Sequence, residues 1–279
     1  MQLSYPGGQL DLGSPVVMGV LNVTPDSFSD GGRYATPDAA ISHGMQLVAE
    51  GAAILDVGGE STRPGAVAVP AAEQLRRVLP VIEALRARSD VLVSVDTSEP
   101  EVIRAAAAAG AGLVNDVRGL MRPGALEAVA DTGVAACLMH MRGEPGTMQQ
   151  SPEYRDVVGE VRTFLAGRVA ACEVLGIARD RLCLDPGFGF GKQTQHNLAL
   201  LLGLPSLARL GLPLLVGLSR KSLLQALTGR PVGGRLAGSV ALATLAAWRG
   251  ARIIRAHDVA ATRDAMQVVA ALQAAAPEG

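Results

Sequence analysis

The sequence is poor in aromatic residues and cysteines, and it contains no long apolar run. Aromatic residues make up 3% of the 279 residues, and there are only three cysteines, Cys137, Cys172 and Cys183. Their odd number and their lack of zinc-ligand spacing predict reduced thiols in or near the core. No apolar stretch reaches the roughly 18 to 20 residues of a membrane helix, so we expect no membrane partner.

Neither sign of charge is in excess. The formal net charge is -1, hydrophobic residues make up 49% and charged residues 18%, as in soluble globular proteins. Nothing indicates a broad basic face for nucleic acid, so a bound anion must be met by a few locally placed cations. The N-terminus, MQLSYPGG, lacks the order of a signal peptide, and we expect a cytoplasmic protein.

Short apolar runs typical of β-strands alternate with segments of helical spacing. The runs span residues 16–22, 53–58, 91–96, 112–117, 135–140, 181–185, 212–219 and 252–257. Continuously apolar strands indicate a parallel sheet covered on both faces. Eight such units in this length predict an α/β fold of the (β/α)8 TIM barrel type, with an open doubly wound sheet as the competitor. No low-complexity linker interrupts the alternation, so residues 1–279 are predicted to form a single domain.

Three long segments fit neither strand nor helix. They span residues 23–36, 58–70 and 141–152, and each follows the carboxyl end of a predicted strand. In a barrel that end holds the active site, and long loops there commonly bind ligands or act as lids. The first of them places the aromatic Phe28 in a polar, glycine-rich setting that offers it little to pack against.

Polar residues gather at the last positions of the predicted strands. They are Asn22, Asp56, Asp96, Asn115, Asp116, His140, Asp185, Ser219, Arg255 and His257. Any single Asp or Asn could equally be a helix cap or a turn former. Recurrence at the same end of nearly every strand is harder to explain by capping, and in a barrel these side chains would converge on one mouth.

The charges at that mouth indicate two kinds of ligand group. Asp96, Asn115 and Asp185 are acceptors that suit adjacent N–H donors, such as the edge of a guanine-like or pterin-like ring. The cations are Arg63, Arg220, Lys221, Arg255 and, as a further candidate, His257. Most of these cations follow the last two strands, a region that often binds phosphate in barrels.

One glycine-rich segment only resembles a phosphate loop. In DPGFGFGK (185–192), Pro186 stands where the motif needs its first glycine, and Gln193 replaces the required Ser or Thr. We expect these glycines to allow close approach of the backbone to a ligand, with Phe188 or Phe190 as a wall. For His140 and His196, which have no acidic partner at metal spacing, structural roles are expected.

Several motifs together resemble the dihydropteroate synthase family of pterin-binding TIM barrels. They occur in order at residues 18–32, 56–65, 94–103, 115–119, 139–149, 184–192, 217–222, 235–239 and 255–259. The resemblance implies a transferase of folate biosynthesis that joins 6-hydroxymethyl-7,8-dihydropterin pyrophosphate to 4-aminobenzoate. Pyrophosphate would leave first, and the amine would then attack a dihydropterin cation.

The resemblance also implies a role for individual residues. The pterin would be bound by Asp96, Asn115, Asp185, Lys221 and Arg255, and of these Asp96, Lys221 and Arg255 would be catalytic. The negative charge of Asp96 would stabilise the cation. Pyrophosphate would be bound by Asn22, Thr62, Arg63, Arg255 and His257, and Asn22 would be the protein ligand of a Mg²⁺ cofactor.

The second substrate is implied to lie nearer the surface. Its pocket would contain Phe28, Thr62, Pro64, Phe190, Lys221 and Ser222, and it would also accept sulfonamides. The loop that carries Phe28 would close over the site once pyrophosphate is bound and exclude water. Members of the family usually form homodimers, so we expect a homodimer here.

Two other functions fit parts of the same pattern. Methyltetrahydrofolate-binding domains of corrinoid methyltransferases have similar pterin acceptors, but the segment SRKS (219–222) and the long first loop favour the synthase. A catalytically silent homologue that only binds a pterin is the other alternative. The presence of Asp96, Lys221, Arg255 and His257 argues against it.

Overall fold

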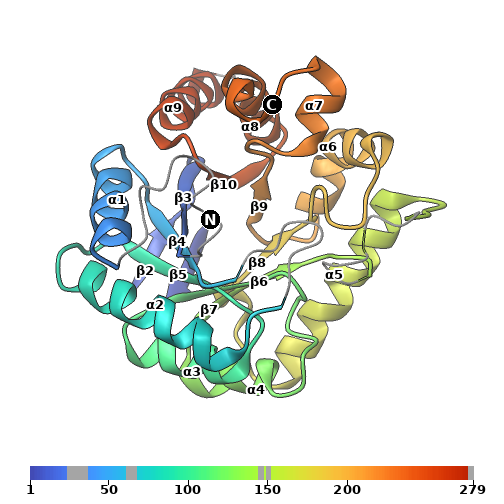
Figure 1. Cartoon of the computed structure of the whole chain (residues 1–279). Coiled ribbons are helices and arrows are strands. Elements are labelled where there is room, and N and C mark those ends of the chain that lie inside the picture. Colours follow the sequence, from blue (N-terminus) through green and yellow to red (C-terminus); the bar gives the residue numbers. More distant parts are fainter. Residues whose placement is uncertain (24–36, 61–67, 144–147, 149–151, 276–279) are drawn as a thin grey trace.

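The predicted alternation of strands and helices is present in the three-dimensional structure. The computed structural model describes residues 1–23, 37–60, 68–143, 148 and 152–275. The barrel strands are β3 (Val16–Asn22), β4 (Ile54–Gly58), β5 (Leu92–Asp96), β6 (Leu113–Asp116), β7 (Ala135–Met139), β8 (Leu182–Asp185), β9 (Leu214–Gly217) and β10 (Ala251–Ala256). All are parallel and close in the order β10-β3-β4-β5-β6-β7-β8-β9 (Figure 1), which confirms the barrel and excludes the open sheet.

Helices form a ring outside the strands, as Figure 1 shows in a view along the barrel. They are α1 (Pro37–Ala49), α2 (Ala71–Arg86), α3 (Pro100–Ala108), α4 (Ala125–Thr132), α5 (Val157–Val174), α6 (Thr194–Ala208), α7 (Ser222–Thr228), α8 (Leu236–Trp248) and α9 (Val259–Ala275), with short 3-10 turns η2 (Arg179–Arg181) and η3 (Val232–Gly234). Helix α3 begins with a proline, and Gly110, with φ of +101°, follows its end.

Side chains inside the barrel form an apolar layer and, above it, a polar one. Because strand side chains alternate, every second residue points inward. Near the amino ends of the strands the interior is filled by Met18, Ile54, Leu92, Leu113, Cys137, Cys183, Leu215 and Ile253. Two positions later on their strands, the buried residues Asp56, Ser94 and Asn115 make the interior polar. Polar ligands can therefore be met at the carboxyl ends of the strands.

An N-terminal hairpin packs onto the apolar layer, and the sequence analysis missed it. Strands β1 (Gln2–Tyr5) and β2 (Gly8–Asp11) pair antiparallel. Leu3 and Leu12 are fully buried in the same cluster as Ile54 and Leu113. A period-two pattern around the turn Pro6–Gly7 was the available signal. The hairpin covers the end of the barrel opposite the polar layer.

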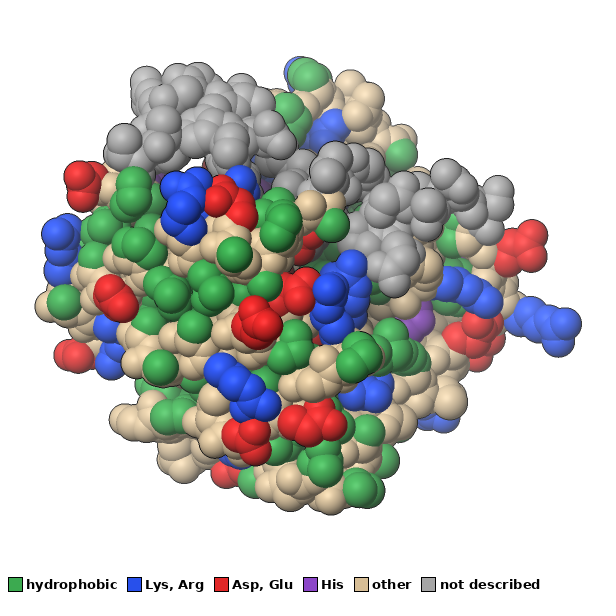
Figure 2. All heavy atoms as spheres, turned by 60° about the horizontal axis from the view of Figure 1, so that its bottom comes forward, with side chains coloured by type: hydrophobic (Ala, Val, Ile, Leu, Met, Phe, Trp, Pro, Cys, Tyr) green, Lys and Arg blue, Asp and Glu red, His purple; other side chains and the backbone are tan. Residues whose placement is uncertain are grey.

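Other predictions about the whole chain can be compared with the structure. Cys137, Cys172 and Cys183 are buried free thiols, as predicted. Among the described residues, no helix has both the length and the apolar character needed to cross a membrane. On the side of the barrel shown in Figure 2, acidic and basic side chains are interspersed.

Candidate active site

The register of the strands brings the predicted pterin residues to one end of the barrel. Asp96 on β5 lies beside Asn115 on β6, and Asp185 on β8 lies beside Met139 on β7. Arg255 on β10 reaches inward from the other side. All three acceptors are buried, with exposed fractions of 4 to 7%. The structure thus assembles Asp96, Asn115, Asp185 and Arg255 as the sequence analysis expected.

Asp56 on β4 is the centre of the polar layer. Its carboxylate accepts hydrogen bonds from Ser94 Oγ at 2.7 Å, Asn115 Nδ2 at 2.9 Å and Arg255 Nε at 2.6 Å. The side chain is completely buried, so these three donors replace water around the charge. Asp56 therefore fixes the orientation of two residues that face the pocket, although the sequence analysis gave it no role in binding.

Asp96 shares the guanidinium of Arg255 with Asp56. Arg255 Nη2 lies 3.1 Å from Asp96 Oδ2, while Arg255 Nε contacts Asp56. Burial and, after it, the neighbouring charge of Asp56 raise the pKa of Asp96 to about 8, although the charge of Arg255 opposes them. In the empty site Asp96 is therefore largely protonated at neutral pH, and a positively charged group close to it favours its ionised form.

Asn115 presents an acceptor that no described residue satisfies. Its Nδ2 donates to Asp56, which turns Oδ1 the other way, and this buried oxygen has no hydrogen-bond partner in the described part of the chain. A buried polar atom without a partner is unfavourable by about 1 to 3 kcal/mol. An N–H group of a ligand would remove this penalty, so Asn115 Oδ1 marks the pocket as a site for a hydrogen-bond donor.

Asp185 and Lys221 lie close enough together for the charge of each to influence the pKa of the other. Asp185 Oδ1 accepts from the amide of Gly187 at 2.7 Å. Burial raises the pKa of Asp185, and the charge of Lys221 is the largest opposing cause. Burial lowers the pKa of Lys221 to about 8, and Asp185 opposes this shift. A carboxylate and an ammonium thus face each other in a poorly solvated place.

Phe190 forms a wall next to Lys221. The ammonium of Lys221 lies 4.7 Å from the centre of the Phe190 ring, and it donates to the carbonyl oxygen of Phe188. Phe190 is half-buried and packs against a cluster that includes Met139 and Met148. Phe188 is 1% exposed and belongs to the core. Of the two candidate walls, Phe190 is the one that borders the site.

Two glycines of the segment 185–192, Gly187 and Gly191, closely approach protein backbone. Gly187 and Gly191 have φ of +71° and +61°. A Cβ at Gly187 would lie 1.9 Å from the carbonyl oxygen of His140, and one at Gly191 would lie 2.3 Å from that of Arg142. Only glycine fits such contacts. They pack the loop after β8 directly against the loop after β7.

Ser219 and His257 meet where β9 and β10 end. Ser219 Oγ accepts from the His257 amide at 3.2 Å and lies 3.0 Å from His257 Nδ1. Arg220 makes two hydrogen bonds to Asp258, of 2.6 and 3.1 Å, so its charge is balanced within the protein. The predicted cationic end is therefore assembled around His257 and Arg255, with Ser222 exposed at the start of α7.

Asn22 reaches over the backbone of Gly58. A Cβ built on Gly58 would lie 3.5 Å from Asn22 Oδ1 and 3.8 Å from Asp96 Oδ2. The absence of a side chain at Gly58 therefore leaves room between two oxygen atoms that can act as ligands of a cation. Hard divalent cations prefer such oxygen ligands.

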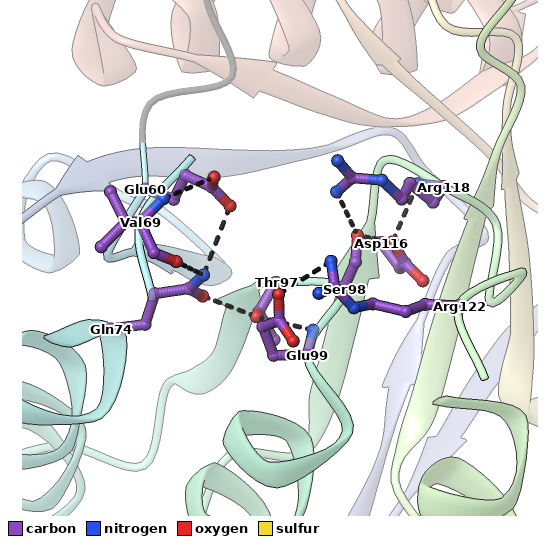
Figure 3. Close-up of polar contacts among 9 residues, drawn as sticks. All are labelled: Glu60, Val69, Gln74, Thr97, Ser98, Glu99, Asp116, Arg118 and Arg122. Carbon is purple, nitrogen blue, oxygen red and sulfur yellow. Dashed lines mark hydrogen bonds and ion pairs between the residues drawn. The ribbon is translucent and has the colours of Figure 1, made fainter. Parts of the chain in front are cut away.

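Two strand-end residues do not join the pocket. Asp116 accepts from Ser98 Oγ and, at 2.8 Å, from the amide of Arg118 (Figure 3). It also accepts from the amide of Leu120 at 2.8 Å. It follows the inward-facing Asn115 and so belongs to the other face of β6. His140 contacts Lys192 instead. For Asp116 the turn-forming alternative was correct, and for His140 the structural role was.

The ends of the loop after β4 are tied to α2 and β5. Gln74 Nε2 donates to Glu60 Oε2 at 3.3 Å and to the carbonyl of Val69 at 2.9 Å, and Gln74 Oε1 accepts from Thr97 Oγ1 at 2.8 Å (Figure 3). Glu60 in turn accepts from the Val69 amide. The predicted site residues Thr62, Arg63 and Pro64, and Phe28 of the predicted lid, lie outside the described residues.

Comparison with known proteins gives one consistent result. The sequence profile of the family described as pterin binding enzyme matches residues 18–257. The curated dihydropteroate synthase of Escherichia coli strain K12 is 54% identical over 271 residues, which cover 97% of this chain and 96% of that protein.

Solved structures agree with this. The Yersinia pestis dihydropteroate synthase in complex with a sulfonamide drug superposes with a TM-score of 0.95 at 52% identity, covering 99% of this chain and 100% of that one. The Xanthomonas albilineans dihydropteroate synthase with 4-aminobenzoic acid has a TM-score of 0.93 at 56% identity, covering 99% of both chains. The chain therefore belongs to the dihydropteroate synthase family of pterin-binding enzymes.

Proposed function

We propose that this chain transfers the dihydropterin methylene group of 6-hydroxymethyl-7,8-dihydropterin pyrophosphate to the amine of 4-aminobenzoate. The products are 7,8-dihydropteroate and pyrophosphate. The observation that carries the proposal is the buried Asn115 Oδ1, which has no hydrogen-bond partner among the described residues and lies on the same polar end of the barrel as Asp56, Asp96 and Asp185. These acceptors suit the adjacent N–H donors on the edge of a pterin.

Binding of the pterin follows from the orientation of these acceptors. Asn115 Oδ1 and the carboxylate of Asp185 accept from the ring and its exocyclic amine, and the ammonium of Lys221 donates to the ring carbonyl. Asp56 and Asp96 fix the position of the planar Arg255 guanidinium, which can stack on the ring. A neutral, planar heterocycle thereby satisfies groups that are otherwise poorly solvated.

The reaction begins when the bond between the methylene carbon and the pyrophosphate oxygen breaks. The electron pair leaves with pyrophosphate, and the pterin methylene becomes a cation. Asp96, beside Asp56, supplies negative charge close to this group, and a nearby cation favours the ionised form of a carboxyl. His257 and Arg255 are proposed to bind the departing pyrophosphate.

The second step forms the new bond. The amine lone pair of 4-aminobenzoate attacks the methylene carbon, and the nitrogen then loses a proton. Phe190 provides a flat wall for the benzoate ring, with Lys221 next to it. Thr62, Pro64, Phe28 and Ser222 are proposed to complete this pocket. Sulfonamides resemble aminobenzoate and are proposed to bind at the same place.

A Mg²⁺ ion is proposed to bind next to Asn22. The oxygen donors of Asn22 and Asp96 face the space above Gly58, which fits a hard cation that keeps several waters. When bound, the ion would offset the charge of pyrophosphate and so favour its departure. Thr62 and Arg63 are proposed as further pyrophosphate contacts.

The assembly proposed for the chain is a cytoplasmic homodimer of single-domain subunits. Exposed apolar side chains lie along α7, η3 and α8. They are Leu227, Val232, Leu236, Leu245 and Trp248, each about half exposed. Large apolar residues gathered on adjacent elements are typical of an interface. Light scattering after gel filtration would give twice the monomer mass of 28.7 kDa if the dimer forms.

The proposed reaction is tested with purified protein, dihydropterin pyrophosphate and Mg²⁺, with and without 4-aminobenzoate. The expected result is pyrophosphate release that increases when aminobenzoate is added, with dihydropteroate formed in equal amount. Binding of the pterin without formation of dihydropteroate would instead indicate a pterin-binding protein or another pterin transfer.

A further inference from the structure

Lysine is almost absent from this chain. Of its 25 basic residues only two, Lys192 and Lys221, are lysines, and all the others are arginine. Both lysines contact the segment 185–190, which carries Asp185 and Phe190. Lys221 is already part of the proposed site, whereas Lys192 has no role in it.

The ammonium of Lys192 is enclosed by protein acceptors. It donates to the carbonyl oxygens of Gly187 and Phe190, both at 2.9 Å, and lies 3.2 Å from the carbonyl oxygen and 3.0 Å from Nδ1 of His140. The residue is 3% exposed. An ammonium has three protons around one nitrogen, so it can satisfy acceptors that converge on a point. A guanidinium, whose donors spread over a plane, does not match this geometry.

The acceptors of Lys192 define both ends of one short segment. Gly187 also donates its amide hydrogen to Asp185 Oδ1, and the ring of Phe190 lies beside Lys221. One ammonium therefore holds the backbone between the pterin acceptor and the aminobenzoate wall. It joins that backbone to His140 at the end of β7, which is a neighbouring strand.

Asn197 on α6 also makes hydrogen bonds to the same segment. Asn197 on α6 accepts from the Gly189 amide at 2.8 Å, and its Nδ2 lies 3.3 Å from the carbonyl oxygen of Lys192. Asn197 is 3% exposed. The residues between Gly187 and Lys192 are thus fixed by buried polar groups rather than by their own regular structure.

We propose that Lys192 is a positioning residue for the transfer reaction, and that its enclosed ammonium fixes the relative position of Asp185 and Phe190. The two substrates react only if the methylene carbon and the amine nitrogen are held at close range and in line. Misplacing the segment by a fraction of an ångström slows the chemical step more than it weakens the binding of either substrate alone. This role rests on the proposed function.

The test compares Lys192→Met with Arg181→Met. Methionine has a similar length to lysine but no donor. Arg181 likewise donates to carbonyl oxygens, those of Val129 and Val134, but it lies in η2, immediately before β8, at the far end of the barrel. Both variants remove a cation that bonds to backbone, and only one of them touches the site. Lys192→Gln serves as a second variant that returns an amide donor.

We expect Lys192→Met to lower kcat by about tenfold or more, because a small misplacement of groups that position the substrates slows the chemical step. The Kd for dihydropterin pyrophosphate should change by less than about threefold, since the pterin acceptors remain. Lys192→Gln should recover part of kcat. Arg181→Met should lower Tm and leave kcat at the wild-type value.

Wild-type kcat and KM values in Lys192→Met would overturn the proposal, whatever happens to Tm. So would a kcat loss of equal size in Arg181→Met at the same temperature below both melting points. If Lys192→Met does not fold, the kcat values of two other variants, Lys192→Gln and Lys192→Ala, decide instead. A wild-type kcat in both of these variants would refute the role. If the wild-type protein binds the pterin but forms no dihydropteroate, the proposed function fails, and the role of Lys192 fails with it. If the wild-type protein does form dihydropteroate, the proposed function stands, and the variants then test the role of Lys192 alone.

Discussion

Arg255 donates its Nε hydrogen to Asp56 over 2.6 Å, although the two residues lie 199 positions apart in the chain. They come from β10 and β4, which flank β3 in the closed barrel. The contact exists only because the barrel is closed. It fixes the guanidinium that also reaches Asp96, so the first and last parts of the chain together form the pterin site.

Replacing Asp56 with alanine should disturb both stability and binding. Arg255 would lose its shorter ion pair, and breaking one partner of a buried pair is unfavourable by about 3 kcal/mol. Asn115 would lose the acceptor that orients its amide, so its Oδ1 could turn away from the pterin. Thermal unfolding and pterin titration measure the two effects. Asp131→Ala is the control, because the partner of Asp131, Arg104, is exposed and exposed ion pairs contribute little to stability. Equal losses of stability in the two variants would contradict the central role of Asp56.

The pH dependence should report Asp96. Its pKa is raised to about 8 from 3.8, so the folded protein binds more protons than the unfolded chain between these values. The contribution of Asp96 to stability therefore falls as pH rises through that window. Asp96→Asn should gain stability relative to wild type from pH 5 to pH 9. A difference in Tm that stays constant over this range would be inconsistent with the raised pKa.

The two lysines can be titrated individually. Burial lowers the pKa of Lys192 to about 7 and that of Lys221 to about 8. With lysine labelled at Cε with ¹³C, the spectrum should show two signals with midpoints near these values, and Lys192→Met assigns them. Because the unfolded chain keeps protons up to about pH 10.5, each lysine should add stability as pH rises from its folded pKa to that value. Midpoints near 10.5 would refute the burial of both ammonium groups.

Phe190→Ala should separate the two substrates. The ring faces Lys221 and borders the aminobenzoate side, whereas no pterin acceptor depends on it. KM for aminobenzoate should rise by about tenfold, the effect of losing one aromatic contact, and Kd for the pterin pyrophosphate should stay near the wild-type value. Val268→Ala, exposed on α9, is the control. Equal weakening of both substrates would argue against the wall.

The barrel could be predicted because each of its strands has a sequence pattern that can be recognised locally. Residues 54–58 and 92–96 are buried on both faces and mostly apolar, with Asp56 and Ser94 as polar residues in mid-strand, and this pattern can be recognised without any knowledge of the strand's partners. The hairpin of β1 and β2 was not predicted because each strand has only four residues. The apolar face of the hairpin consists of little more than Leu3 and Leu10. Short strands carry too little periodicity to stand out.

The site could be predicted only in part. Asp96, Asn115 and Asp185 were found because their strands end there, but Asp116 shares that position and faces the other way. A one-residue difference along a strand reverses the direction of a side chain. The roles of Asp56 and Lys192 depend on partners far away in the sequence, Arg255 and His140, and no local pattern marks such contacts.

The most direct test of the account is the single-turnover rate of pyrophosphate release in Asp96→Asn, measured with saturating aminobenzoate. Asparagine keeps the shape of the side chain and removes the charge that stabilises the methylene cation. The account predicts a rate lower by about 10² to 10³, the loss found when one charge-stabilising group is removed from a transition state, with a much smaller change in pterin Kd. A rate equal to that of the wild type would contradict the role of Asp96 in stabilising the cation.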